Sequence, residues 1–397
     1  MPGFEAMKAR EEKLLCRTYG RYPVAVERAL GSRMWDTDGR EYVDLLAGIA
    51  VTALGHCNPE IAEVISEQAK KLIHVSNLFY QEEQLDLAES LLDTCHMGKV
   101  FFCNSGAEAN EAAIKIARRY HQRVKNDGAF EVITLRDAFH GRTLSTLAAT
   151  GQAKYLDGFD PETPGFRHVP AGDIDALKAA VNGNTAAVLM EMVQGESGIR
   201  PLDPEYARAV QDLCREKGIL FMADEVQAGL CRSGKWWAFQ QYGLEPDVFT
   251  SAKALANGLP LGAMLCTDEV SKAFVAGSHA TTFGGGALVT KVGSKVLEIM
   301  KRDSLAERAQ KLGDAFRARV RSLKHPLIRD VRGLGLLIGI ELADAETAQK
   351  IWEAVLARGF VCSLCHGLTL RLVPALTIDE SDLTAFAGVL GEELAKL

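Results

Sequence analysis

Three features are missing from this chain of 397 residues, and each absence excludes a class of protein. No stretch approaches the roughly 20 apolar residues that a membrane-spanning helix requires, so we expect no membrane association. The formal charge of −7 is spread without long blocks of one sign, which argues against nucleic-acid binding. Residues 1–23 mix both charges and lack the apolar core of a signal peptide, so we expect a cytoplasmic protein.

The nine cysteines also lack the spacing of a disulfide framework or a zinc site. Their number is odd and their positions are scattered, which is typical of reduced thiols in a cytoplasm. Cys362 and Cys365 form one C-x-x-C, but no second pair accompanies it and the Ser-Leu between them lacks a redox context. We therefore interpret them as ordinary thiols and predict no metal site.

Apolar residues make up 47% of the chain and charged residues 24%, as in an ordinary globular enzyme. In the middle of the chain, segments typical of strands alternate with segments typical of helices. We expect strands at 99–104, 130–135, 186–192, 218–223, 247–251 and 262–267, and helices at 108–123 and 206–217. This alternation predicts an α/β fold with a mostly parallel sheet covered by helices.

The two ends of the chain have a different pattern. Residues 24–45 are typical of a β-meander, with Asp38-Gly39 as a turn signal. From about residue 305, a long amphipathic helix leads to a strand at 334–342, a helix at 346–358, two short strands and a last helix. We therefore predict a large α/β domain at 51–300 and a smaller α+β domain built from residues 1–50 and 301–397.

Two charged residues follow expected strands. Asp224 ends an apolar strand at the sheet edge where ligands of open α/β sheets bind, and a carboxylate there can hold a ring nitrogen in its protonated form. The alternative is a helix N-cap. Lys253 lies among apolar and glycine residues, where desolvation lowers the pKa of an amine and makes it a nucleophile. The alternative is a surface lysine.

Three further segments have features of a ligand site. Ser105, Gly106 and Ala107 lie at a strand-to-helix turn whose N–H groups suit a phosphate, although the pattern also serves as a helix cap. Thr281 and Thr282 begin a glycine-rich loop before another helix. The segment 137–143 (DAFHGRT) offers Phe139 for stacking on a flat ring and Arg142 for binding a carboxylate. Core packing is the alternative for Phe139, and we interpret His140 as a structural histidine.

Together these segments resemble the class III (ω-amino) aminotransferases of fold type I, and among them the acetylornithine aminotransferases. The similarity covers residues 32–374, nearly the whole chain. It is carried by the motifs GIAVTALGHCNPE, NSGAEANEAAIKIARR, AFHGRT, QGE, ADEVQAGLCRSG, TSAKALANGLPLGAM and TTFGGG. The resemblance implies pyridoxal 5′-phosphate as cofactor, amino acids and 2-oxo acids as substrates, and a homodimer with shared active sites.

The resemblance also implies roles for individual residues. Lys253 would be the Schiff-base lysine, and Asp224 would pair with the pyridine nitrogen. The other implied cofactor contacts are Val226 and Phe139 on the ring faces, Gln227 near the phenolic oxygen, Gly106 and Ala107 at the phosphate, and Thr282 at the phosphate of the neighbouring subunit. The implied substrate contacts are Arg142 and Arg371 as carboxylate clamps, Glu196 as the partner of Arg371 when an ω-amine is bound, and Thr281.

The implied reaction moves the terminal amino group of N-acetyl-L-ornithine to 2-oxoglutarate, giving N-acetylglutamate 5-semialdehyde and glutamate, in arginine biosynthesis. Alternatives are transamination of succinylornithine, succinyldiaminopimelate or ornithine, an aminomutase or racemase, and a non-catalytic binding protein on the same scaffold. The chain departs from the family pattern at Gly286-Ala287, where Asn-Pro is usual, at Met192 in place of proline, and at Ser197 in place of glycine. None of these departures removes a catalytic group.

Overall fold

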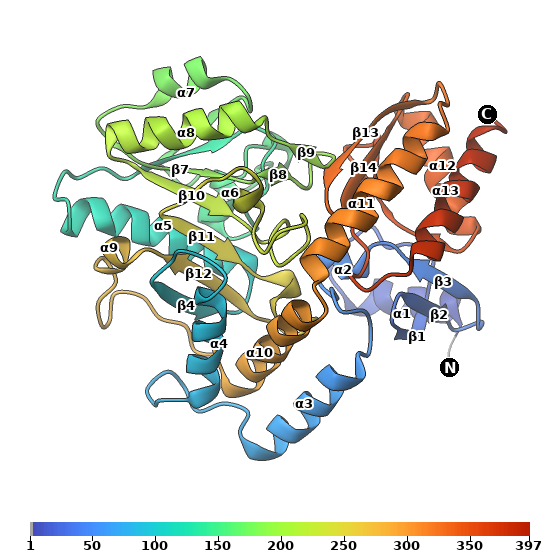
Figure 1. Cartoon of the computed structure of the whole chain (residues 1–397), viewed down its shortest axis with the longest axis horizontal. Helices are drawn as coiled ribbons and strands as arrows, with labels where there is room; N and C mark the ends of the chain where they lie inside the picture. Colours follow the sequence, from blue (N-terminus) through green and yellow to red (C-terminus); the bar gives the residue numbers. More distant parts are fainter. Residues whose placement is uncertain (1–2) are drawn as a thin grey trace.

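The computed structural model describes residues 3–397 (Figure 1). A seven-stranded sheet forms the centre of its larger part. Its strands, in spatial order, are β4 (Lys99–Cys103), β12 (Gly262–Cys266), β11 (Val248–Ser251), β10 (Leu220–Asp224), β7 (Thr185–Met190), β5 (Glu131–Leu135) and β6 (Phe166–Val169). Only β12 runs antiparallel to its neighbours. The predicted α/β fold with a mostly parallel sheet is confirmed, and the six predicted strands agree within a few residues, whereas β6 was not predicted.

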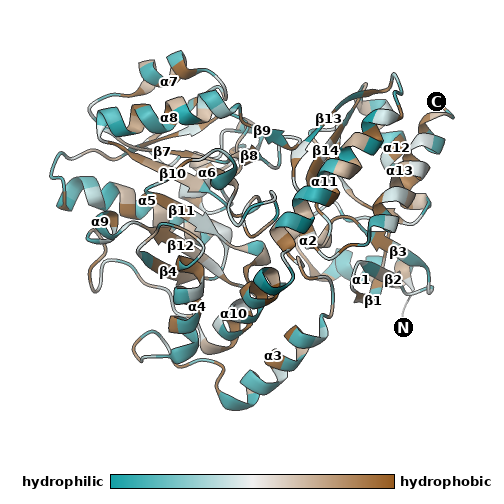
Figure 2. Cartoon of the chain, viewed as in Figure 1, coloured by the Kyte–Doolittle hydropathy of each residue, from teal (hydrophilic) through white to brown (hydrophobic). Residues whose placement is uncertain are grey.

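Helices cover both faces of this sheet, which is why its central strands β7, β10 and β11 are buried at every position and mostly apolar. On β10, Leu220 and Met222 pack on the face covered by α5 (Gly106–Arg123). Phe221 and Ala223 point to the opposite face, toward α8 (Pro204–Lys217). Alternation along the strand therefore places apolar side chains in two separate cores. The surrounding helices carry both hydrophilic and hydrophobic residues, as expected when one side faces solvent (Figure 2).

The two ends of the chain come together in the smaller part of the molecule (Figure 1). The predicted meander is confirmed as β1 (Val26–Leu30), β2 (Arg33–Asp36) and β3 (Glu41–Asp44), and β15 (Phe360–Val361) pairs with β3. A second antiparallel sheet has the order β13 (Ile328–Leu334), β14 (Leu337–Leu342), β17 (Thr369–Leu372) and β16 (Ser363–Cys365). The accompanying helices are α11 (Leu305–Ser322), α12 (Ala345–Ala357) and α13 (Glu380–Leu394).

Several elements were not predicted from the sequence. The longer ones are the helices α1 (Phe4–Leu14), α3 (Pro59–Lys71), α4 (Glu82–Leu92), α7 (Ile174–Ala180) and α10 (Ala287–Arg302), and the strands β6 and β13. The shorter ones are α2 (Ala47–Ala50), α6 (Leu144–Ala149), α9 (Asp268–Ser271), β8 (Val193–Gln194), β9 (Arg200–Pro201) and the 3₁₀ turns Ala153–Tyr155, Ala238–Gln241 and Lys253–Ala256. The start of α3 did have a sequence signal, because the Asn58 side chain caps it and Pro59 is its first residue.

Across residues 3–397, no helix has both the length and the apolar character to cross a membrane. The same residues contain no group of three or more His, Cys, Asp or Glu side chains placed to hold a metal ion. All nine cysteines are free, and Cys362 and Cys365 are buried.

Candidate active site

A cavity of about 410 Å³ lies at the carboxyl ends of β10 and β11 and the start of α5. It brings together residues that lie as far apart in the sequence as Ser105 and Lys253. The predicted site residues that line it are Ser105, Gly106, Ala107, Phe139, Arg142, Asp224, Val226, Gln227 and Lys253. Thr281, Thr282, Glu196 and Arg371 do not line it. The carboxyl edge of the sheet is where an open α/β fold places its ligands.

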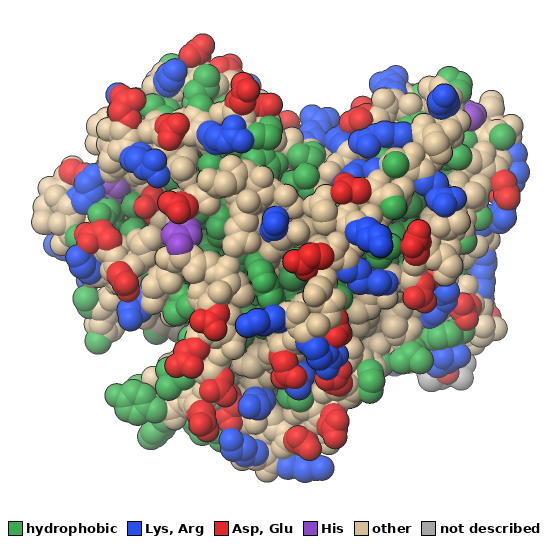
Figure 3. All heavy atoms as spheres, in the orientation of Figure 1, with side chains coloured by type: hydrophobic (Ala, Val, Ile, Leu, Met, Phe, Trp, Pro, Cys, Tyr) green, Lys and Arg blue, Asp and Glu red, His purple; other side chains and the backbone are tan. Residues whose placement is uncertain are grey.

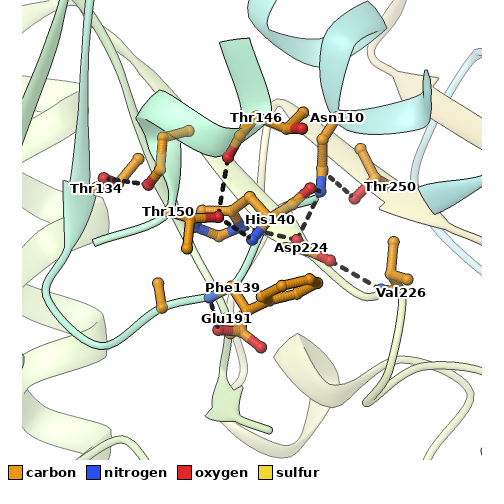
Figure 4. A network of polar contacts seen from close by, with 12 residues as sticks. Asn110, Thr134, Phe139, His140, Thr146, Thr150, Glu191, Asp224, Val226 and Thr250 are labelled. Atoms are coloured by element: carbon orange, nitrogen blue, oxygen red, sulfur yellow. Dashed lines mark hydrogen bonds and ion pairs between the residues drawn. The ribbon is translucent and has the colours of Figure 1, made fainter. Parts of the chain in front are cut away.

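Asp224 ends β10 with a buried carboxylate that accepts three hydrogen bonds (Figure 4). Asn110 Nδ2 and His140 Nδ1 both donate to Oδ2 at 2.8 Å, and the Val226 N–H donates to Oδ1 at 3.0 Å. Asn110 is itself oriented by the Thr250 hydroxyl, which donates to its Oδ1 at 2.8 Å. No helix begins at residues 225–227, so the N-cap alternative for Asp224 is wrong.

His140 has a more specific place than a structural histidine. Its ring bonds to Asp224, its backbone N–H donates to the Thr150 hydroxyl at 2.9 Å, and its backbone carbonyl accepts from Asn110 at 2.7 Å. It is therefore fixed on three sides and orients the Asp224 carboxylate. Asn110 was not identified from the sequence, because its partners lie 30 and 114 residues away and leave no local signal.

Lys253 follows β11 and lines the same cavity. Its φ of 47° lies in the left-handed region, which is uncommon for a residue with a side chain and is typical of functional sites. Burial lowers the pKa of its ammonium group, and the Glu196 carboxylate acts in the opposite direction. A lowered pKa increases the fraction of the neutral amine, which is the nucleophilic form. The surface-lysine alternative does not agree with this position.

The other end of the cavity is the start of α5. Ser105 caps this 18-residue helix by accepting from the Glu108 N–H at 3.2 Å. Gly106 must be small, because a Cβ there would lie 2.6 Å from a methyl group of Val226. First-turn N–H groups and the helix dipole make such a position favourable for an anion.

These residues fit pyridoxal phosphate. The start of α5, whose N–H groups favour an anion, the buried Asp224 carboxylate and Lys253 all line one cavity. Phe139 and Val226 add an aromatic ring and an aliphatic side chain to the lining. The crowding of Gly106 against Val226 shows that this wall has no room for a larger residue at the helix start.

Arg142 is exposed and stacks on aromatic rings. Its guanidinium carbon lies 4.1 Å from the ring centre of Tyr155 and 5.6 Å from that of Phe139. Tyr155 contacts Phe139 edge-on at 5.8 Å between centroids. In the part of the chain that the structure describes, no carboxylate forms an ion pair with Arg142. Tyr155 was not identified from the sequence, since it lies in a 3₁₀ turn outside every motif.

Arg371 lies on β17 and is buried, and it forms the expected ion pair with Glu196. Its Nε donates to the Ser363 hydroxyl at 3.0 Å. Burial would raise the pKa of Glu196, but the Arg371 guanidinium holds it below its usual value. Gln227, which lines the cavity, donates to the same Glu196 carboxylate at 3.3 Å. Ser363 was not identified from the sequence, because its contact with Arg371 is made across two paired strands.

The two threonines of the glycine-rich loop are placed differently. Thr281 Oγ1 accepts from Asn104 Nδ2 at 3.2 Å, and Asn104 lines the cavity. The Thr282 side chain is exposed and lies outside the cavity of its own chain. Gly286, the N-cap of α10, makes no side-chain cap, as its residue type requires.

Comparisons with known proteins agree on one family. The pattern of the family described as aminotransferase class-III matches residues 15–393. An acetylornithine aminotransferase of Methanocaldococcus jannaschii is 42% identical over 98% of this chain and 97% of its own length. One of Myxococcus xanthus is 44% identical over 96% and 95%. The ornithine aminotransferase structure from Toxoplasma gondii has a TM-score of 0.96 at 30% identity, covering 100% of this chain and 96% of that one.

We predict that Lys253→Ala will bind the cofactor but form no borohydride-reducible link to it. Loss of the amine removes both the covalent attachment and a proton carrier, so transamination should fall by about 100- to 10,000-fold. Peptide mapping after reduction and steady-state rates measure the two effects. Lys235→Ala, which changes an exposed lysine outside the cavity, should behave as the unaltered enzyme. A reduced adduct on another lysine would contradict the assignment.

Proposed function

The chain belongs to the class III aminotransferase family, and we propose that it transfers the terminal amino group of N-acetyl-L-ornithine to 2-oxoglutarate. The protein is a pyridoxal-phosphate-dependent transferase. The products would be N-acetylglutamate 5-semialdehyde and glutamate, in arginine biosynthesis. The names of its relatives support this substrate, since they are acetylornithine aminotransferases that match nearly the whole chain.

The observation that carries the proposal is the unequal state of two arginines near the cavity. Arg371 is neutralised by Glu196, whereas Arg142 is exposed and stacked on Tyr155. N-acetylornithine has a carboxylate far from the reacting amine and only hydrogens beside it. This substrate suits the pair of arginines. Arg142 would be free to bind the distal carboxylate. Arg371 would lie near the reacting carbon with its charge covered by Glu196, because an unpaired charge facing an apolar carbon is unfavourable.

The same arrangement accommodates the second substrate. Glutamate carries an α-carboxylate next to its amine, and Arg371 would bind it once Glu196 moves away. Arg142 would hold the distal carboxylate in both half-reactions, since both substrates have one. Gln227 contacts both members of the Arg371–Glu196 pair and also lines the cavity, so it connects this exchange with the cofactor site.

The remaining roles follow from the site. Pyridoxal phosphate, when bound, acts as an electron sink for the carbanion that deprotonation of the substrate creates. Asp224 would hold a proton on the ring nitrogen, and His140 and Asn110 would keep its carboxylate in place. Gly106 and Ala107 would bind the phosphate, and Phe139 and Val226 would hold the ring. Lys253 Nζ would take the proton from the substrate carbon that carries the amine.

We also propose a homodimer in which Thr282 serves the phosphate of the other subunit. Its exposure outside its own cavity supports this role. Large apolar side chains are exposed as well: Phe283, the next residue, by 69%, and Leu78, Phe79 and Tyr80 by 86%, 65% and 102%. The last three follow Asn77, whose Nδ2 donates to the backbone carbonyl of Gly284 at 2.9 Å. Hydrophobic atoms project from the lower left of the space-filling view (Figure 3). Exposed apolar groups of this size are typical of an interface.

The domain boundaries at residues 50 and 300 stay a prediction.

The proposed substrate is tested by steady-state kinetics of the holoenzyme with 2-oxoglutarate. We expect the highest kcat/KM for N-acetyl-L-ornithine, measured against N-succinyl-L-ornithine, N-succinyl-L,L-diaminopimelate and ornithine, with glutamate formed in equal amount to the amine consumed. If one of the other three amines has a higher kcat/KM, that amine is the substrate in place of N-acetyl-L-ornithine. No glutamate from any of them would contradict the proposal.

The two arginines should differ in single-turnover experiments. We predict that Arg371→Ala slows the glutamate half-reaction about 10- to 100-fold more than the N-acetylornithine half-reaction, because charge-assisted contacts to the α-carboxylate are lost. Arg142→Ala should slow both to a similar degree. Glu196→Ala should favour glutamate, because it leaves Arg371 uncovered. Equal losses in both half-reactions for Arg371→Ala would leave Arg371 as a structural residue.

The dimer is tested by subunit complementation. We predict weaker cofactor binding in Thr282→Ala, whereas Thr282→Ser, which keeps the hydroxyl, should bind as the unaltered enzyme. An equal mixture of Lys253→Ala and Thr282→Ala chains should recover up to about a quarter of full activity, because half of the dimers are hybrids with one intact site of two. The assay is run at limiting cofactor. A fully active monomer in sedimentation would exclude shared sites.

A further inference from the structure

Glu191 is a buried acid beside Asp224 to which the sequence pattern gave no role. β7 and β10 are parallel neighbours, and Met190 pairs with Ala223 in their register. The next residues along each strand, Glu191 and Asp224, therefore leave the sheet side by side at its carboxyl edge. Glu191 is only 5% exposed, and it lines the cavity. Two carboxylates at this edge are costly to bury unless both are well bonded.

The Glu191 carboxylate bonds to two different loops through backbone N–H groups. Oε2 accepts from Phe139 at 3.0 Å, and Oε1 accepts from Gly195 at 3.2 Å. Figure 4 shows it beneath Phe139, on the side of the loop opposite to His140. The next residue in each loop has a partner of its own, since His140 bonds to Asp224 and Glu196 pairs with Arg371.

The loop at Gly195 has little freedom to move. A Cβ on Gly195 would lie 2.5 Å from Gln227 Oε1, so this backbone already contacts the residue that joins the cavity to the Arg371–Glu196 pair. A small shift of Gly195 therefore displaces Gln227 or Glu196. The bond from Gly195 to Glu191 fixes the loop where it contacts Gln227.

We propose that Glu191 is a positioning residue that ties the loop carrying Phe139 to the loop carrying Glu196, so that one carboxylate sets both the cofactor-facing ring and the acid that covers Arg371. The inference rests on the proposed function for the role of Glu196. The ionised carboxylate is suited to this task because each oxygen accepts one N–H, whereas an amide would present its NH₂ group to one of the two donors.

Burial disfavours the ionised form of Glu191, whereas His140 and the two hydrogen bonds favour it. Burial raises the pKa of Glu191 to about 7; His140 opposes the rise, Asp224 adds to it, and the N–H groups of Phe139 and Gly195 oppose it. If this position served packing alone, an apolar side chain would fill it without the cost of burying a carboxylate. The two backbone N–H donors are the contacts that compensate the charge.

Glu225 supplies a matched control. It is also a buried glutamate that accepts two backbone N–H bonds, from Ala238 at 2.7 Å and Phe239 at 2.9 Å, and burial raises its pKa to about 8. It holds a 3₁₀ turn and bonds to neither of the two loops that Glu191 joins. Glu225→Gln should therefore lower the free energy of unfolding as Glu191→Gln does, but it should leave cofactor binding and the ratio of the half-reaction rates unchanged.

The experiment compares holoenzymes of Glu191→Gln, Glu191→Asp and Glu225→Gln by three measurements. These are the visible circular dichroism of the bound cofactor with its dissociation constant, the single-turnover rates with N-acetylornithine and glutamate, and thermal unfolding. In Glu191→Gln we expect an altered dichroism, about tenfold weaker cofactor binding, and a ratio of N-acetylornithine to glutamate rates that falls about threefold to tenfold. The ratio falls because a displaced Glu196 no longer covers Arg371.

The outcomes separate the two roles. Glu225→Gln should keep the dichroism and the rate ratio of the unaltered enzyme. If Glu191→Gln changes only the melting temperature, the positioning role is overturned. If Glu191→Gln fails to fold, Glu191→Asp decides, because it keeps the charge but is too short to reach both loops; unchanged dichroism and rate ratio in it overturn the proposal. If the unaltered enzyme does not use N-acetylornithine, the proposed function fails, while the dichroism and binding data still test the tie to Phe139.

Discussion

The buried carboxylate of Asp224 is the group around which the site is arranged. An unpaired charge in such a place is strongly unfavourable, and removing one partner of a buried ionic contact typically costs about 3–5 kcal/mol. Asp224 avoids this cost with donors from three separate segments: Asn110 on α5, His140 in the loop after β5, and the backbone of Val226. Helix α5, the loop that carries Phe139, and the strand that carries the acid are therefore fixed relative to one another by a single side chain.

The same edge of the sheet carries a second and a third buried acid. The hydrogen-bond donors to each of these carboxylates are backbone N–H groups. Glu191 bonds to Phe139 and Gly195, and Glu225 bonds to Ala238 and Phe239. Desolvation raises the pKa of both, to about 7 and about 8. Each buried acid therefore also fixes the segment that supplies its donors: a 3₁₀ turn for Glu225, and for Glu191 the loop that carries the cavity-lining Phe139.

The sequence predicted those features that depend on local order along the chain. Asp224 follows an apolar strand, Gly106 begins a helix after a capping serine, and Lys253 lies in a glycine-rich turn; each is visible within a few residues, and the structure places all three in one cavity. Asn110, Tyr155, Ser363 and the contacts of Glu191 were missed. Their function depends on partners brought near by the fold, such as Arg142 for Tyr155 and Arg371 for Ser363, and no local pattern encodes such a partner.

Arg142 and Arg371 show why residue type alone does not determine chemistry. Both carry the same guanidinium, but Arg371 lies on a strand, is 3% exposed, and is held by Glu196 and Ser363. Arg142 is exposed on a loop, and the faces of aromatic rings, which attract a cation without neutralising it, are its neighbours. A group that must bind a carboxylate in every cycle needs a partner that never competes for its hydrogen bonds. A group that binds one substrate and ignores the other, as proposed for Arg371, needs a partner that does compete, and the Glu196 carboxylate pairs with Arg371 in this structure.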